Sequence, residues 1–379
     1  MYFNWKRFLR DVWISFFPKR HPHLRIDGHR ARVLVMFVFC MGWMAGSGRL
    51  GLLLDHILFP TFKRQRVRRP VFIIGNFRSG STLLHRMLAA SEPFTAMKTW
   101  ELYFAPSISQ RKFWRGFWIV DGWFGGLVRR TILSAQEKQL GSVTMHRVRL
   151  EEPEEDEAIF LYLWDSLFNW FFVPAEAEKN PYWRFDEAVP RWRRRRAMRF
   201  YHGVLKRHLW TAPRNAVYIS KSPAFTARIH SLLEEFPDAR VIELVRRPEE
   251  VVVSGAAWFS FAWHFFASPV AKVPFRDTFL EMVKRWYLVA DALSTELPPE
   301  QYSMLRYEAL VEDPERAVVT VVERMGIKVS DALRERLTAL AKAKRKRRTH
   351  DYDLADIGVS REFLLGEFAE VYERLGYKE

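Results

Sequence analysis

Residues 75–82 have the types and spacing expected of a loop that binds phosphate. The segment reads Gly-Asn-Phe-Arg-Ser-Gly-Ser-Thr and lies between the short apolar run Val71–Ile74 and the helix-like stretch Thr82–Ala90. In a strand, loop and helix arrangement, successive backbone N–H groups at the helix N-terminus can surround an anion. A nucleotide triphosphatase needs a lysine directly after the second glycine, but Ser81 stands there and Arg78 supplies the positive charge. We therefore predict a phosphate site that is not that of an ATPase.

A second positively charged element follows the strand-like run Arg240–Val245. Arg246 stands where that run ends, and Ser254 follows eight residues later, about two turns along a predicted helix. A guanidinium at a strand end can bind two phosphate oxygens at once, and the hydroxyl adds a further donor. Because the run does not end in an acidic residue that could hold magnesium, we predict no metal at this site. An ion pair of Arg246 with Glu249 or Glu250 is the alternative.

Three short strand-like runs, at 71–74, 217–220 and 240–245, alternate with segments of helical pattern. This order is typical of α/β proteins, in which a parallel sheet carries helices on both faces. The sequence therefore predicts an α/β fold with a P-loop-like central parallel sheet. A basic linker divides the chain into two predicted domains, residues 1–69 and residues 70–379.

Residues 1–69 have the pattern of a helical segment that associates with a membrane. Apolar residues repeat at helical spacing near the N-terminus with mainly basic residues between them, as in helices that lie in a membrane interface. The apolar side consists of Trp5, Phe8, Leu9, Val12, Trp13, Phe16 and Phe17. Residues 33–48 carry no charge, but Arg49 interrupts the run before Leu50–Leu54, and a spanning helix needs about 20 apolar residues. We predict in-plane or re-entrant membrane attachment, with a single span and a buried hairpin as alternatives.

The charge balance favours anionic partners. The chain of 379 residues has a formal net charge of +16, which attracts nucleotide phosphates, nucleic acid or an acidic membrane surface. We expect no nucleic-acid partner, because only the basic clusters near Arg191 and Lys342 favour one. The single cysteine, Cys40, can form neither an internal disulfide nor a metal cluster, which favours the cytoplasmic side of the membrane.

The two phosphate elements together resemble those of the sulfotransferase superfamily, in its bacterial and Golgi-type branches. In that family an Arg-Ser-Gly-Ser-Thr loop binds the 5′-phosphosulfate of 3′-phosphoadenosine 5′-phosphosulfate (PAPS), while a strand-end arginine and a later serine bind the 3′-phosphate. The resemblance implies a PAPS site in which Arg246 and Ser254 bind the 3′-phosphate. The matching loop residues are Arg78, Ser79, Gly80, Ser81 and Thr82. The resemblance runs from about residue 70 to about residue 326, and residues 1–69 have no counterpart in it.

Two further stretches resemble the same family. Lys221, within Tyr218–Pro223, matches a lysine that approaches the transferred sulfate. Tyr307, within Arg306–Pro314, matches a tyrosine that lies near the nucleotide. The resemblance therefore implies that Arg78 and Lys221 neutralise the leaving phosphate without a metal ion, while Tyr307 helps to hold the nucleotide.

The general base cannot be the histidine of the cytosolic relatives, because Pro223 occupies that position. Golgi-type and several bacterial members use a glutamate soon after the helix that follows the loop, and Glu101 stands there. We predict Glu101 as the general base, with partial burial beside Trp100 raising its pKa toward a useful range. A solvated loop glutamate is the alternative for Glu101, and His146 and the acidic segment 151–157 are the other candidate bases.

The acidic segment 151–157 has two further interpretations. It lacks the alternating spacing of a calcium-binding loop and is typical of a helix start after Pro153, where negative charge offsets the helix dipole. Glu155 is also a candidate for orienting Arg78 or the acceptor.

The resemblance predicts transfer of a sulfuryl group from PAPS to a hydroxyl or amine by in-line displacement. We expect a lipid, or another apolar or lipid-linked acceptor, because two aromatic runs, 160–173 and 258–266, flank the predicted site and residues 1–69 favour a membrane. Ordinary core helices are the alternative for each run. The alternative functions are a membrane-associated nucleotide-binding protein without turnover and a P-loop kinase. We expect a peripheral or monotopic enzyme on the cytoplasmic side of the membrane.

Overall fold

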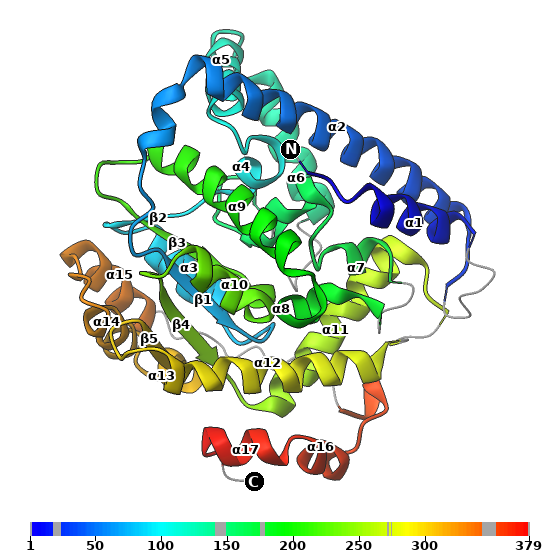
Figure 1. Ribbon diagram of the computed structural model, residues 1–379, viewed down its shortest axis with the longest axis vertical. Helices are drawn as coiled ribbons and strands as arrows, with labels where there is room; N and C mark the ends of the chain where they lie inside the picture. Colours follow the sequence, from blue (N-terminus) through cyan, green and yellow to red (C-terminus); the bar gives the residue numbers. More distant parts are fainter. Residues whose placement is uncertain are drawn as a thin grey trace.

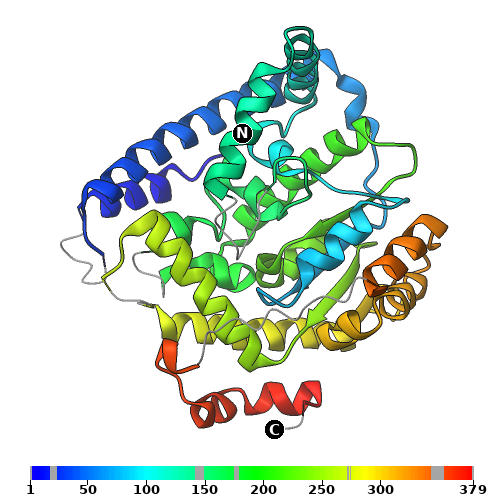
Figure 2. The ribbon, with the colours of Figure 1, turned by 180° about the vertical axis from the view of Figure 1, so that it is seen from behind.

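The computed structural model describes residues 2–17, 24–140, 149–174, 179–270, 273, 275–342 and 354–377. It confirms the predicted α/β class, because helices surround a parallel sheet (Figures 1 and 2). The strands are β1 (Val71–Gly75), β2 (Phe94–Thr95), β3 (Val217–Lys221), β4 (Arg240–Val245) and β5 (Tyr302–Arg306). The α-helices are α1 (Trp5–Phe16), α2 (Gly28–Leu58), α3 (Ser81–Ala89), α4 (Thr99–Phe104), α5 (Ile108–Trp123), α6 (Leu127–Leu140), α7 (Asn169–Phe172), α8 (Phe185–Ala188), α9 (Arg191–Thr211), α10 (Ile229–Glu235), α11 (Pro248–Ala267), α12 (Arg276–Glu296), α13 (Tyr307–Glu312), α14 (Pro314–Arg324), α15 (Asp331–Lys342), α16 (Arg361–Glu367) and α17 (Ala369–Leu375). The 3₁₀-helices are η2 (Pro60–Arg64), η3 (Asp156–Leu163), η5 (Pro181–Arg184), η6 (Pro223–Arg228) and η7 (Leu354–Ile357).

The strands form a parallel sheet in the order β2-β3-β1-β4-β5. β1 lies at the centre, and its Ile73 stands opposite Lys221 of β3 and Ile242 of β4. The three central strands confirm the predicted runs, whereas the edge strands β2 and β5 were not predicted. Because all strands run in one direction, the segments that follow β1, β3 and β4 meet at one edge of the sheet, where α/β proteins bind their ligands.

Both faces of the sheet are buried, because successive side chains of a strand point to opposite faces. Helices α9, α10 and α12 cover one face, and α3, α14 and α15 cover the other, with α3 in front of the strands in Figure 2. Phe72, Ile74, Val241 and Val245 pack in the first layer, while Val71, Ile73, Ile242 and Leu244 pack in the second. This two-sided burial explains why apolar residues dominate the predicted runs, although the third run also contains Arg240 and Glu243.

The N-terminal segment packs against the α/β body through buried polar contacts. The Arg30 guanidinium in α2 donates to the carbonyl oxygen of Phe172 at 2.9 Å. Near the other end of the helix, buried Asp55 accepts from Arg207 Nε at 2.8 Å. Because residues 28–58 form one continuous helix, the buried-hairpin alternative is wrong. The domain boundary at residue 69 stays a prediction.

An apolar face extends over α1, α2 and α5, which lie along one side of the molecule in Figure 1. We use the name apolar face for the exposed residues Trp5, Leu9 and Trp13 of α1, Phe39, Trp43 and Ile57 of α2, and Phe113, Trp123 and Phe124 at α5. By length and composition α2 could cross a membrane, and only 33% of its most apolar window is buried. Apolar surface of this extent is typical of a site that contacts a membrane or another protein.

A buried carboxyl lies in the central sheet, on β4. Glu243 is 1% exposed and accepts a hydrogen bond from the Tyr302 hydroxyl of β5. Burial raises the pKa of Glu243 to about 8, against the lowering effect of the Tyr302 hydrogen bond. Asp291 adds to the rise and Arg306 opposes it. At neutral pH the fold therefore favours the protonated carboxyl.

We expect the Glu243→Gln variant to become more stable relative to the wild type as the pH rises. An unfolded glutamate ionises near pH 4.3, about its ordinary pKa, whereas folded Glu243 ionises near pH 8. The stability that the neutral side chain contributes is therefore complete below about pH 4 and is lost as the pH rises through 8. Melting temperatures measured between pH 5 and pH 9 should show a growing advantage for the glutamine variant. The exposed Glu312→Gln variant is the control, and parallel curves for Glu243→Gln and the wild type would contradict the assignment.

Candidate active site

The loop between β1 and α3 is a tight turn that requires glycine at both ends. Gly80 has φ 92°, and a Cβ there would lie 2.6 Å from the Tyr307 ring. Gly75 has φ 124°, and a Cβ there would lie 2.3 Å from the carbonyl oxygen of Leu244. Both the backbone conformation and the close approach therefore exclude a side chain.

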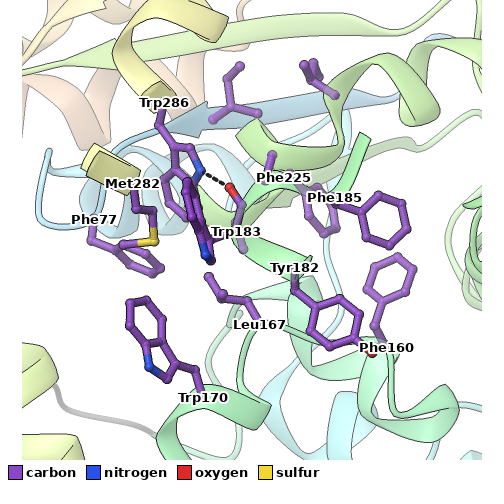
Figure 3. Close-up of a cluster of buried hydrophobic side chains, with 14 of the residues drawn as sticks. Phe77, Phe160, Leu167, Trp170, Tyr182, Trp183, Phe185, Phe225, Met282 and Trp286 are labelled. Atoms are coloured by element: carbon purple, nitrogen blue, oxygen red, sulfur yellow. Dashed lines mark hydrogen bonds between the residues drawn. The ribbon is translucent and has the colours of Figure 1, made fainter. Parts of the chain in front are cut away.

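Two side chains of the loop, Phe77 and Asn76, fix it to the core. The Phe77 ring points into the aromatic cluster of Figure 3, where its centre lies 5.1 Å from the Trp286 ring. It also lies 5.2 Å from the ring of Phe259 in α11. The Asn76 side-chain amide donates to the carbonyl oxygen of Val283 at 3.2 Å. These contacts hold the backbone N–H groups in place before any ligand arrives.

The structure brings together four residues that the sequence predicts for nucleotide binding. Arg78 Nε donates to Ser254 Oγ at 3.0 Å, and Arg246 Nη1 donates to the carbonyl oxygen of Arg78 at 2.9 Å. The Arg246 guanidinium carbon lies 4.4 Å from the centre of the Tyr307 ring. Burial lowers the pKa of Arg78, and the positive charge of Arg246 adds to that shift. The two arginines therefore meet at the loop, and guanidinium groups are the donors that proteins commonly use to bind phosphate.

The remaining loop residues occupy supporting positions. The Ser79 hydroxyl donates to the carbonyl oxygen of Asn76 at 2.8 Å, which closes the turn. Ser81 and Thr82 begin α3, so their backbone N–H groups belong to its first turn.

Arg246 also forms the ion pair that was the alternative interpretation. Its Nε donates at 2.6 Å to Oε2 of Glu250, which lies in the first turn of α11. The Tyr287 hydroxyl donates to the backbone carbonyl of Arg246 at 2.6 Å. Arg246 is therefore oriented from several sides.

Lys221 lies at the carboxyl end of β3, at the same edge of the sheet as the loop. Its Nζ donates to Glu155 Oε1 at 2.7 Å and lies 3.5 Å from Glu154 Oε1. The Lys221 side chain is 1% exposed, so its charge depends on these two carboxylates. Burial lowers the pKa of nearby His85 to about 3, with Lys221 adding to the shift, so His85 is neutral and a weak base.

The acidic segment 151–157 leads into η3, and the carboxylates at its end, Asp156 and Glu157, face partners across the fold rather than solvent. Buried Asp156 accepts from the Tyr218 hydroxyl at 2.7 Å. Glu157 lies 2.7 Å from Arg228. Burial raises the pKa of Asp156 to about 6 and that of Glu157 to about 7, although Arg228 lowers the latter. The predicted helix start is present, yet the sequence reasoning missed this burial, which the apolar run directly after Glu157 indicates.

Glu101 lies in α4 and is occupied by structural contacts. Its Oε2 accepts from the backbone N–H of Lys98 at 2.9 Å, and its Oε1 lies 3.5 Å from Arg111 Nε. His208 Nδ1 lies 3.8 Å from the carboxylate. Burial raises the pKa of Glu101, but Arg111, His208 and Lys98 outweigh it and the pKa is lowered. The prediction of a raised pKa is therefore wrong, and the alternative base His146 lies outside the described residues.

The two aromatic runs lie mostly in the core. In the first run Phe160, Trp164 and Trp170 are fully buried, and in the second Phe259 and Trp263 are buried too.

The second run, in α11, also has a partly exposed aromatic row. The Trp258 and Phe261 rings stack at 5.9 Å, and the Phe261 and Phe265 rings stack at 6.2 Å. Ser254 stands one turn before Trp258 on the same helix, so this row adjoins the cationic cluster at Arg78.

The described residues contain no group of three side chains that could hold a metal ion. Activity without a metal stays a prediction.

The sequence matches the profile of a family described as the sulfotransferase family over residues 70–331. Two curated relatives, the omega-hydroxy-beta-dihydromenaquinone-9 sulfotransferases Stf3 of Mycobacterium bovis and Mycobacterium tuberculosis, are each 25% identical over 319 residues. Those residues are 81% of this chain and 75% of each relative.

Two solved structures share the fold. Sulfotransferase STF1 of Mycobacterium tuberculosis superimposes with a TM-score of 0.71 at 20% identity, covering 97% of this chain and 92% of that one. Sulfotransferase STF9 of Mycobacterium avium superimposes with a TM-score of 0.72 at 19% identity, covering 92% of this chain and 86% of that one.

Proposed function

Because this chain belongs to the sulfotransferase family, we propose that it transfers a sulfuryl group from PAPS to a hydroxyl or amine of a lipid-like acceptor. The observation that carries the proposal is the cluster of Arg78, Arg246, Ser254 and Tyr307 around the loop after β1. A nucleotide with phosphates at both its 5′ and 3′ positions could contact both arginines, because Arg78 follows β1 and Arg246 follows β4.

The residues of the cluster fit such a nucleotide. Burial and Arg246 both disfavour the charge of Arg78, and a bound phosphate would relieve both effects. We assign the 5′-phosphosulfate to Arg78 and to the N–H groups of the loop. We assign the 3′-phosphate to Arg246 and Ser254, with the Tyr307 ring positioning Arg246.

The nucleotide assignment predicts that Arg246→Ala weakens binding of 3′-phosphoadenosine 5′-phosphate by about 10- to 100-fold, the range of one charged hydrogen bond. Binding of AMP should change by less than about threefold, because AMP lacks the contacted phosphate. Calorimetric titration of both nucleotides measures the difference.

Arg247→Ala is the matched control, because Arg247 is the next residue and its side chain is turned toward Glu249 at 3.4 Å. Equal losses for both nucleotides in Arg246→Ala would contradict the 3′-phosphate assignment.

For catalysis, PAPS supplies the sulfuryl group and leaves as 3′-phosphoadenosine 5′-phosphate. We propose that Arg78, Lys221 and the loop N–H groups neutralise the negative charge of the leaving phosphate, as positioned cations do in phosphoryl transfer. The acceptor oxygen bonds to sulfur while the bond from sulfur to the phosphate oxygen breaks, and the acceptor's proton passes to a carboxylate.

Two carboxylates compete for the role of general base. Glu101, which the sequence predicts, is engaged by Lys98 and Arg111. Glu155 contacts Lys221, and its side chain is 13% exposed. A base needs both proximity to the reacting group and access to the acceptor. The contacts therefore support Glu155 better, and Glu101 as the base stays a prediction.

We expect Glu155→Gln to lower the rate by about 10²–10⁴-fold, the usual contribution of a general base, with nucleotide affinity nearly unchanged. Glu101→Gln should instead lower the melting temperature, because it leaves buried Arg111 without its carboxylate. Rates with radiolabelled PAPS and a short-chain hydroxylated menaquinone, measured beside nucleotide titrations, separate these effects.

Glu151→Gln, an exposed glutamate of the same acidic segment, is the control. Glu101 is the base if two results occur together. The Glu101→Gln variant must lose its catalytic rate while keeping the wild-type melting temperature, and the Glu155→Gln variant must keep at least half of the wild-type rate.

The acceptor is proposed to be a hydroxylated apolar lipid. The partly exposed row Trp258, Phe261 and Phe265 leads along α11 away from Ser254. The name of the Stf3 relatives describes a hydroxylated menaquinone derivative as their substrate. The apolar face supports a membrane surface as the partner, and we keep the cytoplasmic side as the expected location.

If the row binds the acceptor, Trp258→Ala should raise the KM for a short-chain hydroxylated menaquinone about tenfold, because an apolar contact of roughly 1.5–3 kcal/mol is lost. The affinity for 3′-phosphoadenosine 5′-phosphate should not change. Trp192→Ala, which alters an exposed tryptophan of α9, should leave the KM unchanged. An unchanged KM in Trp258→Ala would place the acceptor elsewhere.

A further inference from the structure

A basic pocket lies at the edge of the sheet opposite the phosphate loop. Its volume is about 690 Å³, which is the size of many small-ligand sites. Its charged lining residues are Arg64, Arg66, Arg68, Arg69, Arg240 and Lys328. Every one of them is a cation, and no acidic residue lines the pocket.

The pocket is separate from the proposed active site. Val217 and Arg240, which line it, begin β3 and β4, and Arg69 lies two residues before β1. The phosphate loop follows the other end of β1. Five residues at about 3.3 Å each place the two ends of that strand about 16 Å apart. A ligand of the pocket therefore does not reach the loop.

No carboxylate of the described residues lines the pocket beside these positive charges. Within the described part of the chain, none of the six cations forms an ion pair. The nearby Asp238 accepts instead from the backbone N–H of Arg69 at 2.9 Å. Arg240 is 6% exposed, and burial together with the charge of Arg69 lowers its pKa, although Asp238 partly opposes that shift. Concentrated, unpaired positive charge of this kind is relieved when an anion binds.

A second basic hollow shows what a balanced arrangement looks like. Arg191, Arg195 and Arg199 of α9 line it together with Glu234 and Glu235. Arg191 lies 3.5 Å from Glu234. The pocket at the start of β1 has no carboxylate among its described lining residues. The two basic sites therefore differ in whether carboxylates balance their arginines.

We propose that the pocket at the start of β1 is a second anion site that binds a phosphate-bearing polyanion. Several guanidinium groups in one concave site match phosphate oxygens in number and geometry. Two sources share this chemistry. The first is the headgroup of an acidic lipid, because Arg64 lies only six residues beyond the end of α2, where Ile57 of the apolar face is exposed. The second is a free polyphosphate.

Titration of the full chain with tripolyphosphate tests the site. The nucleotide site is first saturated with 3′-phosphoadenosine 5′-phosphate, or weakened by Arg246→Ala, so that it does not take up the probe. The wild type should still bind one tripolyphosphate. The Arg66→Glu/Arg68→Glu variant should bind it at least about tenfold more weakly, because it reverses two of the six positive charges that line the pocket.

Vesicles distinguish the two sources. Neutral phosphatidylcholine vesicles are compared with vesicles that also contain phosphatidic acid. A preference of the wild type for the acidic vesicles that Arg66→Glu/Arg68→Glu loses assigns the pocket to a lipid headgroup. Loss of tripolyphosphate binding alone, with unchanged vesicle binding, assigns it to a free polyphosphate.

Arg195→Glu/Arg199→Glu is the control, because it makes the same charge change in the balanced hollow of α9. The proposal is overturned if this control loses as much binding as the pocket variant. It is also overturned if the wild type binds neither tripolyphosphate nor acidic vesicles. If 3′-phosphoadenosine 5′-phosphate does not bind, that result contradicts the proposed function and not the pocket. The titration of the Arg246→Ala variant with tripolyphosphate would still test the pocket, because it does not need the nucleotide.

Discussion

The site depends on holding two like charges together at one edge of the sheet. Arg78 and Arg246 are joined through a backbone carbonyl at 2.9 Å, and burial disfavours the charge of Arg78. Such an arrangement is costly without a ligand, so packing must hold it in place. Phe77 anchors the loop in the aromatic core, and the Tyr307 ring lies against Arg246. The core thus holds the two arginines in place, and Glu250 supplies a counter-charge to Arg246.

Helix α11 links this cluster to the apolar face. Its first turns carry Ser254, and its last turn presents the carbonyl oxygens of Phe265 and Phe266. His29 Nε2 lies 2.8 Å from the first of these oxygens, and Arg30 donates to the second. The N-terminal helices are therefore fixed to the same helix that carries Ser254. The apolar face and the proposed nucleotide site are in this way held at a constant relative position, which would suit the proposed lipid acceptor.

Local sequence patterns predicted the central strands and the loop, because both depend on neighbouring residues. The strands β1, β3 and β4 are rich in apolar, often β-branched residues and are buried on both faces. The edge strand β2 has only two residues, too few for any pattern. The surroundings of Glu101 could not be predicted, because Arg111 and His208 reach it from other helices. Likewise, Lys221 and Glu155 are 66 residues apart, and only the folded chain brings them together.

The buried acidic segment explains how Lys221 is positioned. Glu155 contacts Lys221 of β3, Asp156 contacts Tyr218 of the same strand, and Glu157 pairs with Arg228 of η6. Removing one member of a buried pair typically costs about 3–5 kcal/mol, so each contact strongly resists displacement. Three consecutive residues are thereby tied to the strand and the turn that follows it. Burial of these charged side chains costs free energy, but it also holds Lys221 and Glu155 in one arrangement at the edge of the sheet. Catalysis by positioning requires groups that are held in one arrangement.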